Sequence, residues 1–207
     1  MKNWPEPFNL VVCGVGGQGN ILISRLIGRI LTTQDYTVSI GETFGAAQRG
    51  GSVFSSLRIS KKRLHGPLIP KGQANIILSL EPMEALRQMK FLGNSEVMVL
   101  TNTKIVQTAD VLAGKVTYPD FDELESTITT LSRQAWFVPA TDIALDLGSA
   151  IVTNIVMLGA LLGSKTMPIS LEQAENEVRA TIPNSQIELN LKALKRGYQG
   201  TLGADDA

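Results

Sequence analysis

The sequence predicts an α/β domain with a mostly parallel sheet that is flanked by helices and followed by a helical C-terminal layer or arm. Short apolar runs typical of strands alternate with segments of helical spacing, which indicates successive βα units. A glycine-rich turn follows the first of these runs, and the last third reads almost entirely as helices. The chain has 207 residues, 43% of them hydrophobic, enough for one sizeable core. We expect residues 8–165 to form the α/β body and residues 166–202 a helical extension of the same domain.

The first βα unit is the most clearly marked. The β-prone run 9–13 ends at Gly14, and a glycine-rich turn leads into a predicted helix over residues 20–31. Apolar side chains recur along that helix at the spacing of one face. They are Ile21, Leu22, Leu26, Ile27, Ile30 and Leu31. Strand, glycine turn and helix in this order are typical of a Rossmann-like fold.

The remaining elements follow from the same patterns. Strands are predicted over 36–40, 53–59, 75–80, 96–100 and 135–138, and helices over 81–92, 121–131, 141–147, 151–162, 171–181 and 185–198. The strand at 53–59 precedes a basic turn at 61–63, so we expect a hairpin-like excursion beside the parallel sheet.

Composition excludes several classes of function. Nineteen basic and nineteen acidic residues cancel, so no charge excess favours capture of nucleic acid or an anionic membrane. The apolar stretch 150–163 is shorter than the roughly 20 residues that cross a bilayer, and Thr153 and Asn154 interrupt it. We expect a buried core helix there. The N-terminus lacks a secretion signal pattern, and the single cysteine rules out an internal disulfide, so a cytoplasmic location is expected.

Few side chains are suited to metal or acid–base chemistry. An iron–sulfur cluster normally takes about four thiolates, and this chain offers only Cys13 together with the single histidine, His65. Any electron-transfer metal is therefore expected on another chain. We interpret Cys13 as a buried small hydrophobe and His65 as a surface turn residue. Asp142 and Asp146 lie one helical turn apart, and we assign Asp142 to the N-terminal cap of its helix.

Gly14-x-Gly16-x-x-Gly19 is the first candidate binding site. Its glycines let the backbone turn sharply and approach an anion closely, and the following helix N-terminus offers unpaired N–H groups to a phosphate. The candidate cofactor-binding residues are Gly14, Gly16, Gly17, Gln18 and Gly19. The alternative is a turn that only packs the helix tightly against the sheet.

A second candidate site lies in the polar, glycine-rich segment 42–51. Glu42, Thr43, Gln48, Arg49 and Gly50 could bind a polar anionic ligand or dock a loop of a partner. Glu42 also stands about where NAD-binding domains place an acidic residue that binds the ribose, although it opens a glycine-rich loop. The alternative is a structural turn in which Glu42 and Arg49 are paired.

Several ordered motifs together resemble the gamma subunit or domain of 2-oxoacid:ferredoxin oxidoreductases. They are the segments 14–19, 41–45 and 48–53 with Arg58 downstream, and the segment 154–160. The segments 66–74 and 80–87 resemble the beta subunit of the indolepyruvate branch more than the pyruvate or 2-oxoglutarate branches. The resemblance covers about residues 8 to 165.

This resemblance implies a divided enzyme. In the family, thiamine diphosphate decarboxylates the 2-oxoacid, iron–sulfur clusters pass electrons to ferredoxin, and coenzyme A takes the acyl group. These cofactors sit mainly on other subunits, so a thiamine-diphosphate and iron–sulfur alpha subunit is the expected partner. This chain would seal the active site and contact coenzyme A through backbone amides or Arg49. Arylpyruvates such as indolepyruvate are the expected substrates, with pyruvate or 2-oxoglutarate as alternatives.

Two other hypotheses remain open. The chain could be a stand-alone dinucleotide- or nucleotide-binding module that uses the glycine turn and Glu42. It could also be a purely structural interaction domain, whose assembled enzyme would be insensitive to substitution of Arg49 or Gly17.

Overall fold

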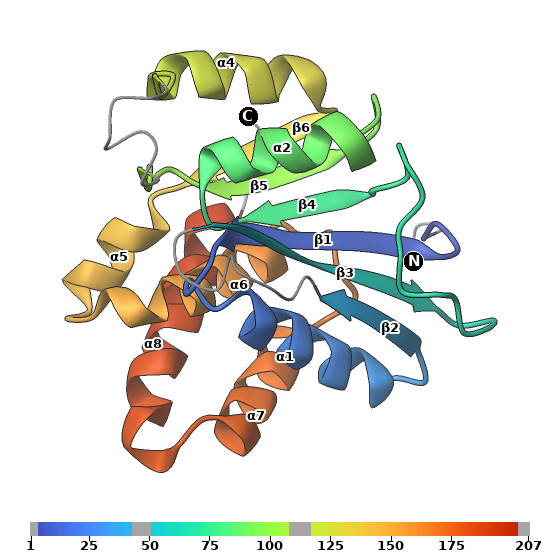
Figure 1. Cartoon of the computed structure of the whole chain (residues 1–207). Helices are drawn as coiled ribbons and strands as arrows, with labels where there is room; N and C mark the ends of the chain where they lie inside the picture. Colours follow the sequence, from blue (N-terminus) through green and yellow to red (C-terminus); the bar gives the residue numbers. More distant parts are fainter. Residues whose placement is uncertain (1–3, 43–50, 108–116, 203–207) are drawn as a thin grey trace.

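A computed structural model describes residues 4–42, 51–107 and 117–202. Its centre is a six-stranded sheet with the order β2-β3-β1-β4-β5-β6 (Figure 1). The strands are β1 (Phe8–Val15), β2 (Thr37–Glu42), β3 (Ser52–Ser60), β4 (Ile76–Ser79), β5 (Met98–Asn102) and β6 (Gln134–Val138). β1, β4, β5 and β6 pair in parallel, and β3 pairs antiparallel with both of its neighbours, β2 and β1. The predicted α/β fold with a mostly parallel sheet is confirmed.

Strands β2 and β3 form an antiparallel pair beside the parallel strands, but the turn predicted at 61–63 does not lead into a second hairpin strand, because no strand lies between β3 and β4. Thr37 pairs with Ser60 at one end and Glu42 with Ser55 at the other. β3 also pairs along its length with β1, from Phe8–Ile59 to Val15–Ser52. β3 therefore lies between β2 and β1 in the sheet. β2 is one edge of the sheet, and Glu42, predicted to open a loop, is its last residue.

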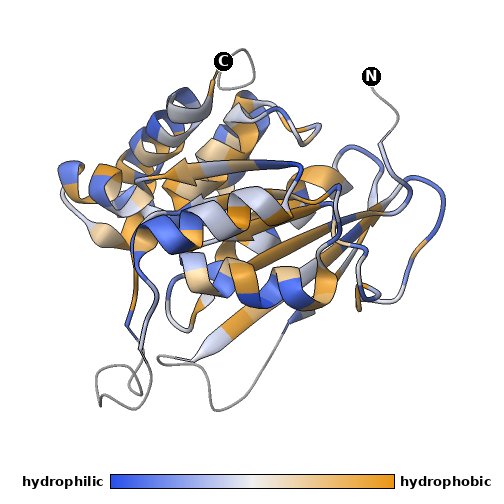
Figure 2. Cartoon of the chain, turned by 90° about the horizontal axis from the view of Figure 1, so that it is seen from above, coloured by the Kyte–Doolittle hydropathy of each residue, from blue (hydrophilic) through white to orange (hydrophobic). Residues whose placement is uncertain are grey.

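Helices cover both faces of the sheet. They are α1 (Asn20–Thr32), α2 (Pro82–Leu92), α4 (Phe121–Leu131), α5 (Ala140–Asp146), α6 (Thr153–Gly163), α7 (Leu171–Thr181) and α8 (Asn184–Thr201), with a short 3-10 helix η2 (Ala150–Val152). α2 and α4 lie on one face, whereas α1 and α6 lie on the other, with α8 packed against α6. Figure 2 shows apolar central strands between helices that carry both polar and apolar residues.

The central strand β1 explains why both faces need cover. Leu10 and Val12 belong to the core on the α1 and α6 side, and Val11 and Cys13 to the core on the α2 side. All eight residues of β1 are buried. A strand buried on both faces reads as a continuous apolar run, which is why this element was predictable.

The C-terminal helices form the predicted layer. α8 lies against α6 at a distance that only glycine permits, because a Cβ on Gly197 would lie 1.9 Å from the carbonyl oxygen of Val156. α7 packs against α1 and α8. The boundary between residues 165 and 166 stays a prediction.

Two predicted elements start more than one residue away from their predicted positions. The helix predicted over 151–162 begins with η2, since the Ser149 hydroxyl accepts the Ile151 N–H, and continues as α6. β5 begins at Met98 rather than Glu96 because Asn94 closes a turn, accepting the N–H groups of Glu96 at 2.8 Å and Val97 at 3.1 Å. Residues 154–163 are all buried, as expected of a core helix. Within the described ranges, no helix combines the length and apolar character needed to cross a membrane.

Candidate functional site

The glycine turn lies at the carboxyl edge of the parallel strands, between β1 and α1. Open α/β sheets usually bind ligands at this edge. Gly17 and Gly19 have φ angles of +101° and +91°, a left-handed conformation that favours glycine. The N–H of Gly16 donates to the carbonyl oxygen of Gly51 at 2.8 Å. The turn therefore contacts the start of β3 as well as the two elements that it joins.

Gln18 holds the turn in place. Its Oε1 accepts the Val15 N–H at 2.7 Å, and its Nε2 donates to the carbonyl oxygen of Leu80 at 3.2 Å. The side chain was a candidate ligand residue, and in the structure its amide is used to join the ends of β1 and β4. A ligand at this turn would therefore meet backbone N–H groups before it met this amide.

A chain of amide hydrogen bonds continues along the same edge, which the sequence analysis missed. The carbonyl oxygen of Leu80 also accepts Asn102 Nδ2 at 3.2 Å. Asn102 Nδ2 lies 2.9 Å from Thr141 Oγ1, and Asn102 Oδ1 accepts the Thr141 N–H at 3.2 Å. These contacts link the glycine turn to the start of α5. An asparagine at the end of a strand was the available signal, but its partner lies 39 residues away.

The N-terminus of α1 is open to an anion. Its N-cap is Gly19, which has no side chain to accept the first N–H groups, and its first turn has no acidic residue. Asn20 Nδ2 donates to the Val53 carbonyl at 3.3 Å, while the buried Oδ1 has no hydrogen-bond partner among the described residues. From the other side, the Asn154 amide lies against Gly19, where a Cβ would stand 2.2 Å from its Nδ2. The N–H groups of Leu22 and Ile23 donate to the Gly19 carbonyl, so a phosphate at this helix end would meet the N–H groups of Asn20 and Ile21.

The N-terminus of α2, by contrast, is occupied by its own carboxylate. Glu81 is the N-cap and accepts the Glu84 N–H at 3.0 Å. Both glutamates are almost fully buried. Tyr118 donates a hydrogen bond to Glu81, Ser52 donates one to Glu84, and Arg87 Nε lies 3.3 Å from Glu84 Oε1. Negative charge is favourable at a helix N-terminus, and here Glu81 already occupies the place that an external anion would take.

Burial raises the pKa of Glu81 above its usual value of 4.5, although hydrogen bonds from Tyr118 and two backbone N–H groups oppose the shift. When the pKa of a carboxyl is higher in the native state than in the unfolded state, its contribution to stability is fully present below the unfolded pKa. That contribution is lost as pH rises through the native pKa. We expect the free energy of unfolding of Glu81→Gln to fall less with pH above about pH 4.5 than that of wild type. The variant should still fold, because Gln can still accept the Glu84 N–H. Urea unfolding at several pH values measures this, with exposed Glu96→Gln as the control. Equal slopes for wild type and Glu81→Gln would contradict the expectation.

Glu42 lies apart from the glycine turn. It pairs with Arg25 of α1, Nε to Oε1 at 3.7 Å. β3 separates β2 from β1, so Glu42 stands two strand spacings, roughly 10 Å, from the strand that carries the turn. The classical ribose contact instead uses a strand next to the first. Thr43, Gln48, Arg49 and Gly50 lie outside the described residues, as does the alternative pairing of Glu42 with Arg49.

Cys13 and His65, the two residues considered as metal ligands, do not lie in surroundings that suit a metal ion. Cys13 is fully buried, its Sγ donates to the Glu84 carbonyl at 3.6 Å, and burial raises the pKa of the thiol. It is the buried small hydrophobe that was expected. His65 is half-buried in the irregular segment after β3, where its carbonyl oxygen accepts the Ser39 hydroxyl. Across the described ranges, no three His, Cys, Asp or Glu side chains form a group that could hold a metal ion.

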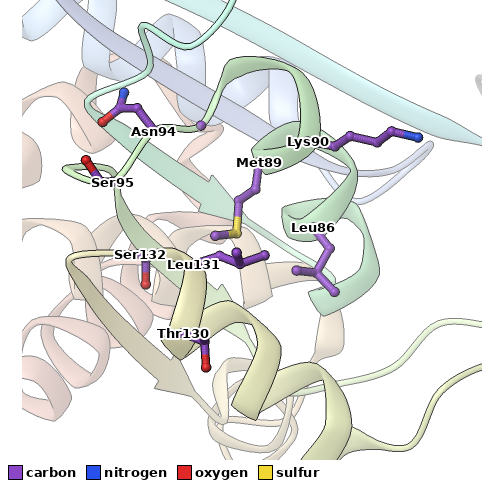
Figure 3. Close-up of a pocket in the computed structure, with 9 residues that line it drawn as sticks. Leu86, Met89, Lys90, Asn94, Ser95, Thr130, Leu131 and Ser132 are labelled. Atoms are coloured by element: carbon purple, nitrogen blue, oxygen red, sulfur yellow. The ribbon is translucent and has the colours of Figure 1, made fainter.

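A separate pocket of about 580 Å³ lies between α2 and α4. Figure 3 shows Leu86, Met89 and Leu131 pointing into the space between these helices. It lies near the C-terminal ends of both helices and the turn before β5, at the sheet edge opposite the glycine turn. Lys90 is the one titratable residue in its lining. The pocket therefore offers little for catalysis and is not part of the candidate site.

Comparison with known proteins places the chain in a family. The model for pyruvate ferredoxin/flavodoxin oxidoreductases matches residues 9–200. An indolepyruvate oxidoreductase subunit, IorB, of Archaeoglobus fulgidus is 42% identical over 190 residues, covering 92% of this chain and 93% of that subunit.

Solved structures share the fold. The gamma subunit of a keto/oxoacid ferredoxin oxidoreductase from Geobacter sulfurreducens has a TM-score of 0.67 at 24% identity, covering 94% of this chain and 98% of that one. A 2-oxoglutarate:ferredoxin oxidoreductase from Magnetococcus marinus has a TM-score of 0.73 at 18% identity, and the match takes up 95% of this chain but 31% of that longer one. With the family model matching nearly its whole length, this chain belongs to the pyruvate ferredoxin/flavodoxin oxidoreductase family.

Proposed function

We propose that this chain is the small subunit of a ferredoxin-dependent 2-oxoacid oxidoreductase of the indolepyruvate type. It would complete the active site of a larger partner subunit for oxidative decarboxylation of an arylpyruvate to its acyl-CoA. The observation that carries the proposal is the 42% identity to the Archaeoglobus fulgidus indolepyruvate oxidoreductase subunit over nearly the full length of both chains. Pyruvate and 2-oxoglutarate are the alternative substrates. The proposed location is the cytoplasm.

The chemistry of the reaction would come from the partner. Thiamine diphosphate supplies the nucleophile for decarboxylation, and iron–sulfur clusters carry the electrons toward ferredoxin. The role of this chain would be to exclude water from the reacting carbon and to hold coenzyme A. We assign the coenzyme A contact to Gly14, Gly16, Gly17, Gln18 and Gly19, with Glu42, Thr43, Gln48, Arg49 and Gly50.

The described part of this site fits a phosphate group. The N-terminus of α1 lacks both a side-chain cap and an acidic first turn, so its N–H groups can meet an anion. Asn20 Oδ1, which has no hydrogen-bond partner in the described part of the chain, can accept a hydrogen bond from a ligand hydroxyl or amide. A coenzyme that carries both phosphates and amides matches this pair of features.

The test is to purify the tagged chain with its partner from its own cells and to assay viologen or ferredoxin reduction. Indolepyruvate, phenylpyruvate, pyruvate and 2-oxoglutarate are compared with and without coenzyme A. We expect a large partner containing thiamine diphosphate and iron, coenzyme-A-dependent activity highest with the arylpyruvates, and no activity from the isolated chain. Highest activity with pyruvate or 2-oxoglutarate would change the substrate class, and absence of such a partner would reject the proposal.

Arg49→Ala tests the coenzyme A contact in that complex. We expect the KM for coenzyme A to rise about tenfold, the effect of losing one charge-assisted hydrogen bond. The rate of 2-oxoacid decarboxylation without coenzyme A should be unchanged. Arg63→Ala, in the exposed turn after β3, is the matched control. An unchanged KM in Arg49→Ala would favour a purely structural role for the segment.

The stand-alone nucleotide-binding module is the weaker candidate. It needs Glu42 beside the glycine turn, whereas β3 intervenes and Arg25 occupies the carboxylate. Calorimetric titration of the isolated chain with NAD, FAD and ATP distinguishes the two hypotheses. Micromolar binding of any of them would revive the module.

A further inference from the structure

Helix α5 and η2 expose apolar side chains at the same edge of the sheet as the glycine turn. Ile151 is 82% exposed and Leu145 55% exposed. Asp142 and Asp146 are also exposed, and Asp142 lies one helical turn from both Leu145 and Asp146, so it neighbours both on the surface of α5. We call Asp142, Leu145, Asp146 and Ile151 the α5–η2 surface. The cap assigned to Asp142 is wrong: Pro139 is the N-cap, and Asp142 lies in the first turn without a side-chain cap hydrogen bond.

The backbone holds these apolar side chains outward. After α5, the N–H of Gly148 donates to the Leu145 carbonyl at 2.8 Å, and that of Ser149 to the Ala144 carbonyl at 3.0 Å. The Ser149 hydroxyl then accepts the Ile151 N–H at 3.4 Å, and the next residue, Val152, is buried in the core. Ile151 is therefore exposed on an ordered segment that both neighbouring elements fix in place. Leu145 and Ile151 thus expose two large apolar side chains on adjoining elements, and apolar side chains that gather on a surface mark contact sites.

The surface adjoins the proposed coenzyme A site. α5 follows the carboxyl end of β6, and α6, which follows η2, brings Asn154 against Gly19. Figure 1 shows α5 projecting beyond the sheet at the edge toward which the parallel strands point. A partner that covers the glycine turn from outside would reach the α5–η2 surface in the same contact.

The charges on the surface indicate the chemistry of that partner. Neither Asp142 nor Asp146 has a basic partner among the residues that the structure describes. Two unpaired carboxylates beside an apolar centre complement an apolar pocket with a rim of lysine or arginine. In the Magnetococcus marinus structure, a domain of this fold occupies only 31% of a longer chain, so a larger body accompanies the fold there.

We propose that the α5–η2 surface docks the larger, thiamine-diphosphate-binding subunit, with Ile151 inserted in an apolar pocket and the two aspartates facing basic side chains. This inference rests on the proposed function. It makes Ile151 the residue of this surface whose substitution weakens the complex most.

The experiment measures the affinity of the purified full chain for the purified larger subunit, identified by its thiamine diphosphate and iron content. We expect Ile151→Glu to weaken binding by 30-fold or more, as at a central interface residue. Leu64→Glu, at a residue that is 70% exposed near the opposite edge of the sheet, should change it less than about threefold. The thermal midpoints of both isolated variants should match wild type, because neither side chain is buried.

A second variant tests the charges. Asp142→Asn/Asp146→Asn should weaken binding at low salt and should reduce the dependence of affinity on ionic strength. Equal binding of wild type and Ile151→Glu would overturn the docking proposal while leaving the proposed function intact. If wild type binds no such subunit, the proposed function itself fails. A homodimer of wild-type chains that Ile151→Glu dissociates would instead assign the surface to a second copy.

Discussion

Gly197→Ala is expected to destabilise the chain by about 3 kcal/mol, the usual cost of forcing extra atoms into a packed contact. The added Cβ would lie 1.9 Å from the carbonyl oxygen of Val156 and 3.0 Å from the N–H nitrogen of Ala160. Backbone cannot move aside as a flexible side chain can, so α8 must shift away from α6. The thermal midpoint should fall by about 10 °C for a domain of this size. Differential scanning calorimetry measures this shift.

Gly200→Ala is the matched control, since it lies in the same helix and its Cβ would meet nothing within 4 Å. Alanine is the better helix former, so this variant should be as stable as wild type or slightly more stable. Gly159→Ala should resemble Gly197→Ala, because its Cβ would lie 2.1 Å from the Leu194 carbonyl. Wild-type stability in Gly197→Ala would mean that α8 does not sit this close to α6.

Local patterns predicted the parts of the fold in which burial decides the element. β1 and α6 are apolar because they are buried, and the turn between β1 and α1 carries glycines because Gly17 and Gly19 adopt positive φ. The insertion of β3 between β2 and β1 was not predictable. Its alternating pattern indicates a strand, but strand order depends on pairing with β1, some forty residues earlier.

The candidate site was harder to predict than the fold. Gln18 and Glu42 have the residue types of ligand-binding groups, and the structure pairs both with the protein itself: Gln18 with the Leu80 carbonyl and Glu42 with Arg25. An amide or a carboxylate serves either purpose, and only neighbours distant in sequence decide which. The Asn102–Thr141 contact illustrates the same limit, since neither residue belongs to a recognisable motif.

Among single Gly→Ala substitutions in the glycine turn, Gly19→Ala is expected to reduce the coenzyme-A-dependent turnover of the assembled enzyme most. The residue has a φ of +91°, and its Cβ would lie 2.2 Å from Nδ2 of Asn154 and 3.0 Å from its Cγ. Relief of this contact requires the buried Asn154 side chain to change its rotamer or the N-terminus of α1 to shift, and either change disturbs the glycine turn. Misplacement of binding groups by about 1 Å costs on the order of 100-fold in rate, so we expect a loss of that size in kcat/KM for coenzyme A.

Two further variants separate the crowding from the backbone strain. Gly72→Ala carries a similar strain, with φ of +70°, but its Cβ would be 3.7 Å from its nearest neighbour and it lies far from the turn. It should lower the thermal midpoint slightly and leave kcat/KM for coenzyme A unchanged.

Asn154→Ala in the Gly19→Ala background removes the amide that the new methyl group meets. It should raise the lowered kcat/KM at least tenfold, in the range of coupling between residues in contact. No restoration would mean that strain at residue 19 alone disrupts the turn. If kcat/KM for coenzyme A is partly restored and the rate of 2-oxoacid decarboxylation is unchanged in every variant, the contact between α1 and α6 serves coenzyme A binding rather than the chemistry of the 2-oxoacid.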